Sequence, residues 1–292
     1  MTIKTVGVIG AGQMGAGIAH VSALHGYDVL IHDVARDRID AGLQTIQKNM
    51  ARQVAKGLID QAGMDGALTR IRPAPELQMI GEADIAIEAA TENEEVKKSI
   101  FKALVPHLKK PETILASNTS SISITRLASV TDRPDRFVGV HFMNPVPLMK
   151  LVEIIPGIAT SKPTYEAAVT YAESLGKITA NSEDYPAFIV NRVLMPMINE
   201  AIFALYEGVG SVEAIDTGVK LGLNHPMGPL ELADYIGLDT VLSIINVLYE
   251  GLSDSKYRAC PLLVKYVEAG WLGRKAGRGF YDYRGDQPVP TR

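Results

Sequence analysis

The sequence of 292 residues has one cysteine, no excess of positive charge and no long apolar run. A single cysteine, Cys260, cannot form an internal disulfide framework or a cysteine-rich metal site, and it fits a reducing compartment. With 29 Lys and Arg against 33 Asp and Glu, the formal net charge is −4, which argues against nucleic acid as a partner. No run approaches the roughly 18 apolar residues of a membrane span, so we expect no membrane partner.

The N-terminal residues, MTIKTVGVIG, enter a strand pattern directly and lack the small-residue cleavage region of a signal peptide. Together with the single cysteine, this favours a cytoplasmic protein. The chain is 47% hydrophobic and 21% charged, as is ordinary for a globular protein. Its length allows two domains of roughly 100–200 residues each.

Strand-like and helix-like segments alternate through residues 1–184, as in a parallel sheet with crossover helices. Strands are expected at Thr5–Gly10, Asp28–His32, Asp84–Ala89, Thr113–Ser117, Phe137–Met143 and Leu151–Pro156. Helices are expected at Met14–His25, Arg36–Leu58, Glu94–Leu108, Pro163–Leu175, Ala187–Glu207, Val212–Leu221 and Pro229–Leu252. The polar stretch Asn181–Pro186 marks the boundary. We predict an α/β domain, residues 1–184, followed by an all-helical C-terminal domain, residues 185–292.

Three glycines follow the first expected strand in the pattern G-x-G-x-x-G, as Gly10-Ala11-Gly12-Gln13-Met14-Gly15. The pattern alone is weak, but here a Val/Ile strand leads in and a helical pattern follows. In that setting Gly10 permits a tight turn, Gly12 lets the backbone approach a pyrophosphate, and Gly15 allows close packing of helix on strand. An ordinary structural glycine turn is the alternative. We favour a Rossmann-type dinucleotide site with a mostly parallel sheet, in which Gln13 and Met14 also contact the cofactor.

An acidic residue, Asp33, stands at the end of the second expected strand, about 20 residues beyond the glycines, where it would accept hydrogen bonds from the adenosine ribose. A carboxylate at this position repels a 2′-phosphate, which favours NAD over NADP. The nearby Arg36 is the counter-argument, because it could accept that phosphate. We predict NAD as the cofactor.

Two ionisable residues lie inside apolar, strand-like runs: His141 within Phe137–Met143, and Glu153 within Leu151–Pro156. The loop between the runs contains two prolines, which cannot continue a strand. Burying a carboxylate among Leu, Val and Ile is unfavourable unless it finds a partner, and His141 is the nearest residue able to pair with Glu153. Such a pair fixes the ring tautomer and makes the imidazole a better base. From these residues alone, a catalytic pair and a structural hydrogen bond are equally supported.

The helical pattern at residues 40–58 carries two stripes. The apolar stripe consists of Leu43, Ile46, Met50 and Val54. The basic stripe on the opposite face consists of Lys48, Arg52 and Lys56. Many solvated helices look like this, and a docking face for a polyanionic ligand is the other explanation.

Seven motifs occur in order along nearly the whole chain. They are GAGQMGAGIA at 10–19, EAATEN at 88–93, SNTSS at 117–121, HFMNPVPLMKLVE at 141–153, FIVNR at 188–192, NHPMGPLELADYIGLD at 224–239 and GRKAGRGFYDY at 273–283. Together they resemble the 3-hydroxyacyl-CoA dehydrogenases, including the short single-function 3-hydroxybutyryl-CoA dehydrogenases of bacteria. Seven ordered motifs are far more specific than any one of them.

The resemblance implies a role for each matching position. His141 resembles the family's general base, and Glu153 the carboxylate paired with it. Ser120 resembles the serine that hydrogen-bonds the reacting oxygen, and Asn191 the asparagine near the substrate carbonyl. Lys56 falls where the family has a lysine that meets coenzyme A, which strengthens the docking explanation of the basic stripe. Cofactor-contacting positions are matched by Asp33, Glu92, Lys97 and Asn144.

The function implied is NAD-dependent interconversion of (S)-3-hydroxyacyl-CoA and 3-ketoacyl-CoA, with 3-hydroxybutyryl-CoA and acetoacetyl-CoA as the expected pair. This is a reaction of fatty acid metabolism and β-oxidation. The resemblance also implies an acyl-CoA partner, no metal, and a homodimer formed through the helical domain, for which a monomer is the alternative. Two rival functions are an NAD-linked hydroxy-acid dehydrogenase acting without coenzyme A and a non-catalytic, crystallin-like protein.

Two positions depart from the family pattern. Ala187 stands where the family often has a glycine before Phe188, and an alanine there is strained if the backbone needs a positive φ. Ala51 stands where some members place a hydroxyl residue near coenzyme A, so one ligand contact would be missing.

Overall fold

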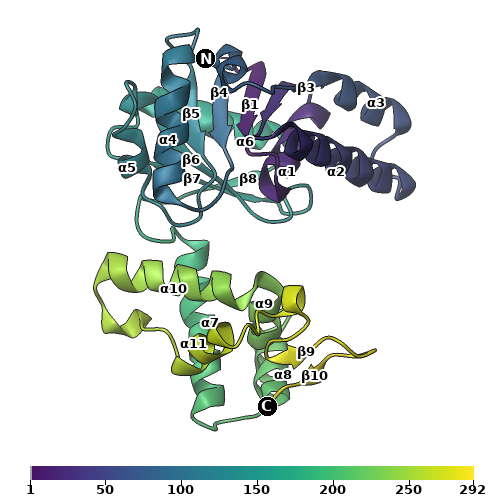
Figure 1. Ribbon diagram of the computed structural model, residues 1–292, viewed down its shortest axis with the longest axis vertical. Helices are drawn as coiled ribbons and strands as arrows, with labels where there is room; N and C mark the ends of the chain where they lie inside the picture. The colour runs from purple at the N-terminus through teal and green to yellow at the C-terminus, as the bar shows by residue number, and fades with distance from the viewer. Residues whose placement is uncertain (1) are drawn as a thin grey trace. The chain divides into compact units, whose positions relative to one another are not determined.

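The computed structural model describes residues 2–292, which form two compact units, one ending at Phe188 and the other spanning Ile189–Arg292 (Figure 1). The first unit is an eight-stranded sheet covered by helices, and the second is mostly helical. The predicted fold class, an α/β part followed by a helical part, is confirmed.

The first unit has the strands β1 (Thr5–Ile9), β2 (Asp28–His32), β3 (Ile71–Pro73), β4 (Ile85–Glu88), β5 (Ile114–Ser117), β6 (Phe137–Phe142), β7 (Leu151–Pro156) and β8 (Ile178–Asn181). Their order in the sheet is β3-β2-β1-β4-β5-β6-β7-β8. β6 and β7 pair antiparallel, and the other neighbours pair in parallel. The strand order reverses between β1 and β4, which is where open α/β sheets bind ligands.

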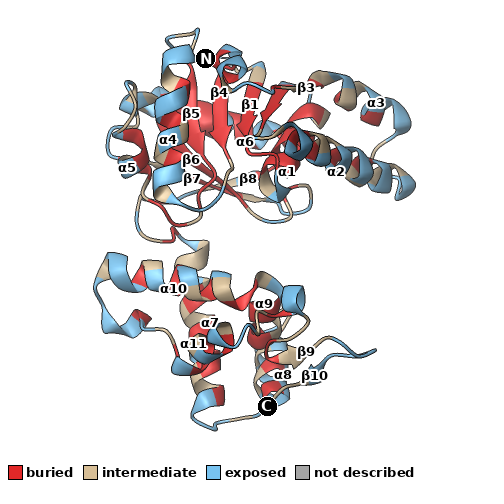
Figure 2. Ribbon diagram, in the orientation of Figure 1, coloured by how far each residue is buried: buried red, intermediate tan, exposed pale blue. Residues whose placement is uncertain are grey.

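Helices cover both faces of this sheet. They are α1 (Gln13–Leu24), α2 (Arg36–Ala55), α3 (Gln61–Arg70), α4 (Glu94–Leu104), α5 (Ile124–Ala128) and α6 (Lys162–Ser174). One core joins the sheet to α1, α2, α3 and α6, and a second core joins it to α4 and α5. Strands β4, β5 and β6 are therefore buried along their whole length (Figure 2), which explains their continuous apolar runs.

Four of the helices and strands of the first unit were not expected from the sequence: β3, β8, α3 and α5, of which α5 has only five residues. β3 and β8 have three and four residues, and β8 is largely exposed or half-buried, so neither shows an apolar run. The apolar stripe of α3 is weak because the helix contains two glycines, and only Met64 and Ala67 of it are buried. Tertiary pairing rather than local preference defines these elements.

The second unit consists of α7 (Val190–Tyr206), α8 (Val212–Gly222), α9 (Pro229–Ile236), α10 (Leu238–Leu252), α11 (Pro261–Glu268) and a short hairpin of β9 (Tyr281–Asp282) and β10 (Val289–Pro290). The single helix expected at Pro229–Leu252 is two helices, because Gly237 adopts a φ of 101° between them. Within the described residues no single helix has the length and hydropathy of a membrane span. Only α9 and α10 taken together reach that length and hydropathy, and this pair is bent by 98°.

Two buried aspartates join the C-terminal segment to the helices of the second unit by hydrogen bonds. Asp216 accepts from the backbone N–H groups of Leu230 and Glu231 at the start of α9 and from the Tyr281 hydroxyl, 2.7 Å away. Asp234 accepts from the N–H groups of Phe280 and Tyr281, and burial raises the pKa of its carboxyl to about 6. A Cβ added to Gly279 would come within 1.9 Å of the Asp234 carboxylate, so this glycine makes room for it. The GRKAGRGFYDY motif therefore has a structural role here.

Candidate active site

The glycine-rich turn joins β1 to α1. Gly10 has a φ of 105°, and a Cβ there would lie 2.6 Å from the Ala89 carbonyl oxygen. A Cβ on Gly15 would lie 1.7 Å from the Gly10 carbonyl oxygen. A Cβ on Gly12, in contrast, would meet no atom of residues 2–292 within 4 Å. Gly10 and Gly15 thus allow close approach of the backbone segments in and beside the turn. Gly12 leaves open space at the N-terminus of α1, where a pyrophosphate is stabilised.

A cavity of about 620 Å³ extends from this turn along the carboxyl ends of the central strands. Gly12, Gln13, Met14 and Asp33 are among its lining residues. The Asp33 carboxylate accepts from the N–H groups of Ala11 and Val34, both at 2.8 Å, and so is fixed at the end of β2. The size and donor set of the cavity fit a dinucleotide.

The arginine beside Asp33 is not the one considered in the sequence. Arg36 forms an ion pair with Asp40, one turn along α2, at 2.9 Å. Arg38 instead lines the cavity, with a guanidinium nitrogen 3.8 Å from the Asp33 carboxylate. The counter-argument based on Arg36 therefore passes to Arg38, which lies in the cavity next to the Asp33 carboxylate.

A buried ion pair lies under the adjoining part of the site. Lys97 on α4 is 1% exposed, and its ammonium nitrogen is 2.8 Å from the carboxylate of Glu88, which is fully buried at the end of β4. The same ammonium lies 3.4 Å from Glu92. Ser117 at the end of β5 donates to Glu88 at 2.7 Å. The sequence analysis did not identify Glu88; the signal was a carboxylate within an apolar, strand-like run, the same signal that identified Glu153.

Glu92 holds the turn that carries Ser120. One of its carboxylate oxygens accepts from the Thr119 hydroxyl at 2.6 Å, from the Ser120 N–H at 2.8 Å and from the Ser120 hydroxyl at 3.0 Å. Burial alone would raise the pKa of Glu92, but the Lys97 ammonium and these hydrogen bonds outweigh it and lower the pKa. An ionised Glu92 therefore orders the SNTSS motif and orients its serine.

His141 and Glu153 face each other across the antiparallel pair β6 and β7, as register partners. The imidazole Nδ1 lies 2.7 Å from a Glu153 carboxylate oxygen. His141 is 7% exposed and Glu153 is fully buried. A carboxylate can only accept, so Nδ1 carries a proton, and in the neutral ring the lone pair is then on Nε2. The Phe142 N–H, one residue further on β6, donates to the Asn118 side chain at 2.9 Å, which ties SNTSS to the strand of His141.

A groove of about 350 Å³ lies between α2 and the loop that joins β6 to β7. Its lining residues include Gln13, Asn49, Arg52, Lys56, Pro145 and Leu148. Of the basic stripe, Arg52 and Lys56 line the groove, whereas Lys48 is not among its lining residues. Asn144 is the second residue of this loop and is exposed. The structure therefore places Lys56 within the same groove as Gln13 of the glycine turn.

Asn191 lies in the first turn of α7 and belongs to the second unit, where it is half-buried. The two residues before α7 that follow Pro186 have a positive φ, as the sequence analysis considered for Ala187. Ala187 has a φ of 65° and Phe188 a φ of 56°, both left-handed, and α7 begins at Val190 instead of Ala187. The alanine in the Pro-Ala-Phe sequence is therefore strained.

We predict that Ala187→Gly leaves the free energy of unfolding unchanged or raises it. Deleting a buried methyl group loses about 0.8 kcal/mol. Relief of the left-handed strain returns roughly 1–2 kcal/mol. Urea denaturation is the measurement, and Ala103→Gly in the exposed face of α4 is the control, expected to lose about 1 kcal/mol. Equal losses in the two variants would show that Ala187 is not strained.

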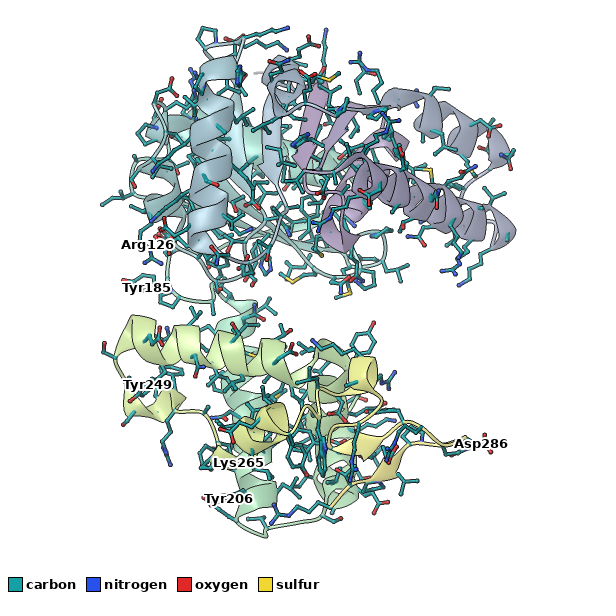
Figure 3. All side chains as sticks on the ribbon, viewed as in Figure 1. Arg126, Tyr185, Tyr206, Tyr249, Lys265 and Asp286 are labelled. Atoms are coloured by element: carbon teal, nitrogen blue, oxygen red, sulfur yellow. The ribbon has the colours of Figure 1, made fainter. Side chains whose placement is uncertain are left out.

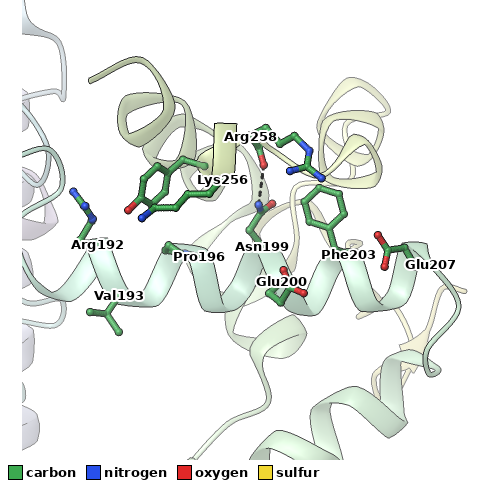
Figure 4. Close-up of a pocket in the computed structure, with 10 residues that line it drawn as sticks. Arg192, Val193, Pro196, Asn199, Glu200, Phe203, Glu207, Lys256 and Arg258 are labelled. Atoms are coloured by element: carbon green, nitrogen blue, oxygen red, sulfur yellow. Dashed lines mark hydrogen bonds between the residues drawn. The ribbon is translucent and has the colours of Figure 1, made fainter. Parts of the chain in front are cut away.

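A second polar cavity, of about 540 Å³, lies along α7 in the helical unit (Figure 4). Asn199 joins α7 to the segment before α11 by donating to the Arg258 carbonyl and accepting from the Cys260 N–H, both at 2.9 Å. The Arg258 guanidinium lies 4.9 Å from the centre of the Phe203 ring, and that of Arg192 lies 5.0 Å from the centre of the Tyr257 ring. The residues predicted as site residues are not among those lining this cavity.

Comparison with known proteins agrees with the motifs. Residues 5–185 match the NAD binding domain of 3-hydroxyacyl-CoA dehydrogenase, and residues 188–283 match its C-terminal domain. A 3-hydroxybutyryl-CoA dehydrogenase of Bradyrhizobium diazoefficiens is 66% identical over 99% of both chains, and a probable one of Bacillus subtilis is 54% identical over 97% of this chain and 98% of the relative. The crystal structure of (S)-3-hydroxybutyryl-CoA dehydrogenase from Ralstonia eutropha superposes with a TM-score of 0.94 at 47% identity, covering 97% of this chain and 100% of that one. The chain belongs to the 3-hydroxyacyl-CoA dehydrogenase family and is an NAD-dependent oxidoreductase.

Proposed function

We propose that this enzyme interconverts (S)-3-hydroxyacyl-CoA, with 3-hydroxybutyryl-CoA as the main substrate, and 3-ketoacyl-CoA, using His141 as the general base and Glu153 as its paired carboxylate. The contact of 2.7 Å between the two side chains, across a buried strand pair, is the observation that carries the proposal. The names of the relatives from Bradyrhizobium and Ralstonia support the choice of the four-carbon substrate.

Each proposed step follows from the position of a side chain. Nε2 of His141 removes the proton of the 3-hydroxyl group, and Glu153 stabilises the imidazolium that forms. NAD, when bound, supplies the hydride acceptor. In the reductive direction the oxygen gains negative charge, and the Ser120 hydroxyl donates a hydrogen bond to it. A donor role for the Asn191 amide is proposed from the family resemblance. Ser120 would reach that oxygen by turning its hydroxyl away from Glu92, which it contacts in this structure.

The cofactor contacts are proposed at two places on the first unit. Gly10, Gly12, Gln13, Met14 and Gly15 form the pyrophosphate turn. Asp33 binds the ribose hydroxyls. Beyond the switch between β1 and β4, Glu92, Lys97 and Asn144 serve the nicotinamide end; the buried Lys97 would act by keeping Glu92 ionised.

We propose that the groove between α2 and the β6–β7 loop binds the polyanionic end of coenzyme A. Lys56→Glu should raise the KM for acetoacetyl-CoA about tenfold, a loss of about 1.4 kcal/mol, because a favourable charge becomes a repulsive one. Initial rates with NADH provide the measurement. Lys48→Glu, on the same stripe but outside the groove lining, is the matched control and should leave the KM within twofold. Equal effects of the two variants would indicate a general surface-charge effect and would contradict a CoA site at Lys56.

We also propose that the enzyme is a cytoplasmic homodimer assembled through the helical unit. Apolar side chains are exposed on that unit, among them Val193, Tyr206, Leu221 and Tyr249, two of which are labelled in Figure 3. A second copy would bury exposed apolar side chains of this kind. Sedimentation at micromolar concentration distinguishes a dimer from a monomer.

A further inference from the structure

The loop that joins β6 to β7, residues 143–150, contains more hydrogen-bond acceptors than it can satisfy by itself. Pro145 and Pro147 have no N–H group to donate. The Pro145 carbonyl accepts from the N–H groups of Leu148 and Met149, both at 3.0 Å. The carbonyl of Val146 then needs a donor from outside the loop, because Val146 is buried and a buried carbonyl without a partner is unfavourable.

Lys177 supplies that donor. Its ammonium nitrogen lies 2.6 Å from the Val146 carbonyl oxygen and 2.8 Å from that of Met149. Gly176, with a φ of 69°, turns the chain out of α6, and Lys177 enters the sheet directly before β8. The next residue, Ile178, donates its N–H to the Lys150 carbonyl at 2.8 Å, so the end of the loop is tied to the same place.

Lys177 forms no ion pair with the residues that the structure describes. The side chain is 9% exposed, and no carboxylate of residues 2–292 lies within 4.0 Å of its ammonium group. Burial lowers the pKa of Lys177. A buried cation is expensive unless its donors are engaged, so its two carbonyl contacts are what make it tolerable here.

The other side of the loop rests on α1. Val146 packs against Gly17, where an added Cβ would lie only 2.8 Å from the Val146 Cβ. The loop is therefore fixed by an apolar contact with α1 and by an ammonium group before β8. Held in this way, Pro145, Pro147 and Leu148 form one wall of the groove whose other wall carries Arg52 and Lys56.

We propose that Lys177 is a positioning residue for substrate binding: it holds the β6–β7 loop in the shape that forms the wall of the acyl-CoA groove. The proposal rests on the proposed function, in which this groove binds coenzyme A. Lys177 acts through the loop and not on the reacting atoms. The His141–Glu153 pair is fixed independently by the strand register, so loss of Lys177 should change KM and spare kcat.

The test compares Lys177→Met with the wild type, using acetoacetyl-CoA and a truncated substrate, acetoacetyl-N-acetylcysteamine, which lacks the part that would occupy the groove. We expect the KM for acetoacetyl-CoA to rise about tenfold, kcat and the Kd for NADH to stay within threefold, and the KM for the truncated substrate to stay within twofold. Lys150→Met removes an exposed lysine from the same loop and should match the wild type. Lys177→Arg, which keeps the charge but displaces the donors, should show a smaller rise in the same KM.

Three results would overturn the proposal. A KM for acetoacetyl-CoA within twofold of wild type would show that the loop does not need Lys177. An equal rise for both substrates would indicate a general structural defect. If Lys177→Met does not fold, these two KM comparisons are made with Lys177→Arg instead. A wild-type enzyme that turns over the truncated substrate but not acetoacetyl-CoA would reject the proposed function itself and this inference with it.

Discussion

Replacement of His141 by glutamine is expected to lower kcat at least about a hundredfold, because a positioned base contributes roughly 10²–10⁴ to the rate. Glutamine fills similar space and can still contact Glu153, but its amide does not take up a proton. The effect should appear equally in kcat and kcat/KM, since the lost interaction is made in the transition state. The measurement is the initial rate of NADH oxidation over a range of acetoacetyl-CoA concentrations that reaches saturation.

Two observations separate a loss of chemistry from a loss of structure. The Kd for NADH should stay within about twofold of wild type, because the dinucleotide cavity does not depend on His141. His107→Gln, an exposed histidine of the same unit, should retain full activity. Turnover of His141→Gln within threefold of wild type would leave the His141–Glu153 contact as a purely structural hydrogen bond.

The second large effect concerns the ion pair between Lys97 and Glu88. Lys97→Met should lower the free energy of unfolding by about 3–5 kcal/mol, because it leaves the Glu88 carboxylate buried without its counter-charge. Glu92 loses its neighbouring cation at the same time, so the turn at Ser120 should loosen and kcat should fall as well. Urea denaturation and initial rates measure the two effects.

The chain offers a matched control one residue away. Lys98 on α4 pairs with Glu94 at 2.8 Å on the surface, so Lys98→Met should have little effect on stability. The double variant Lys97→Met, Glu88→Gln should recover much of the loss, because it removes the uncompensated charge. Similar losses from Lys97→Met and Lys98→Met would contradict the importance of burial at this pair.

Periodicity and motif spacing were sufficient to predict six of the eight strands of the sheet, the glycine turn and the α/β part followed by a helical part. They worked where local pattern and tertiary role coincide: β1 and β6 are apolar because they are covered on both faces. They missed β3 and β8, which are short and depend on pairing with a neighbouring strand. They also extended one helix across Gly237, since a positive φ is a property of the folded backbone.

For the candidate site, the sequence identified ionisable residues that are costly to bury. It missed the residues whose hydrogen bonds hold the surrounding backbone in place. Asn118 and Lys177 both satisfy backbone groups of distant segments. These hydrogen bonds can be recognised only in the folded structure, because the donor and the acceptor are 24 or more residues apart in the sequence. Lys97 was matched to the cofactor, whereas its pairing with Glu88 becomes evident only when β4 and α4 are packed together.

The antiparallel pairing of β6 and β7 has a consequence for how such an enzyme could change its substrate. The ladder, not the connecting loop, determines that His141 faces Glu153. Residues 144–150 can therefore differ in sequence, at the same length, while the buried faces of the two strands keep the pair in register. This loop is a natural site for grafting: exchanging it together with a matching residue at position 177 would alter the groove wall and leave the proton-transfer pair in place.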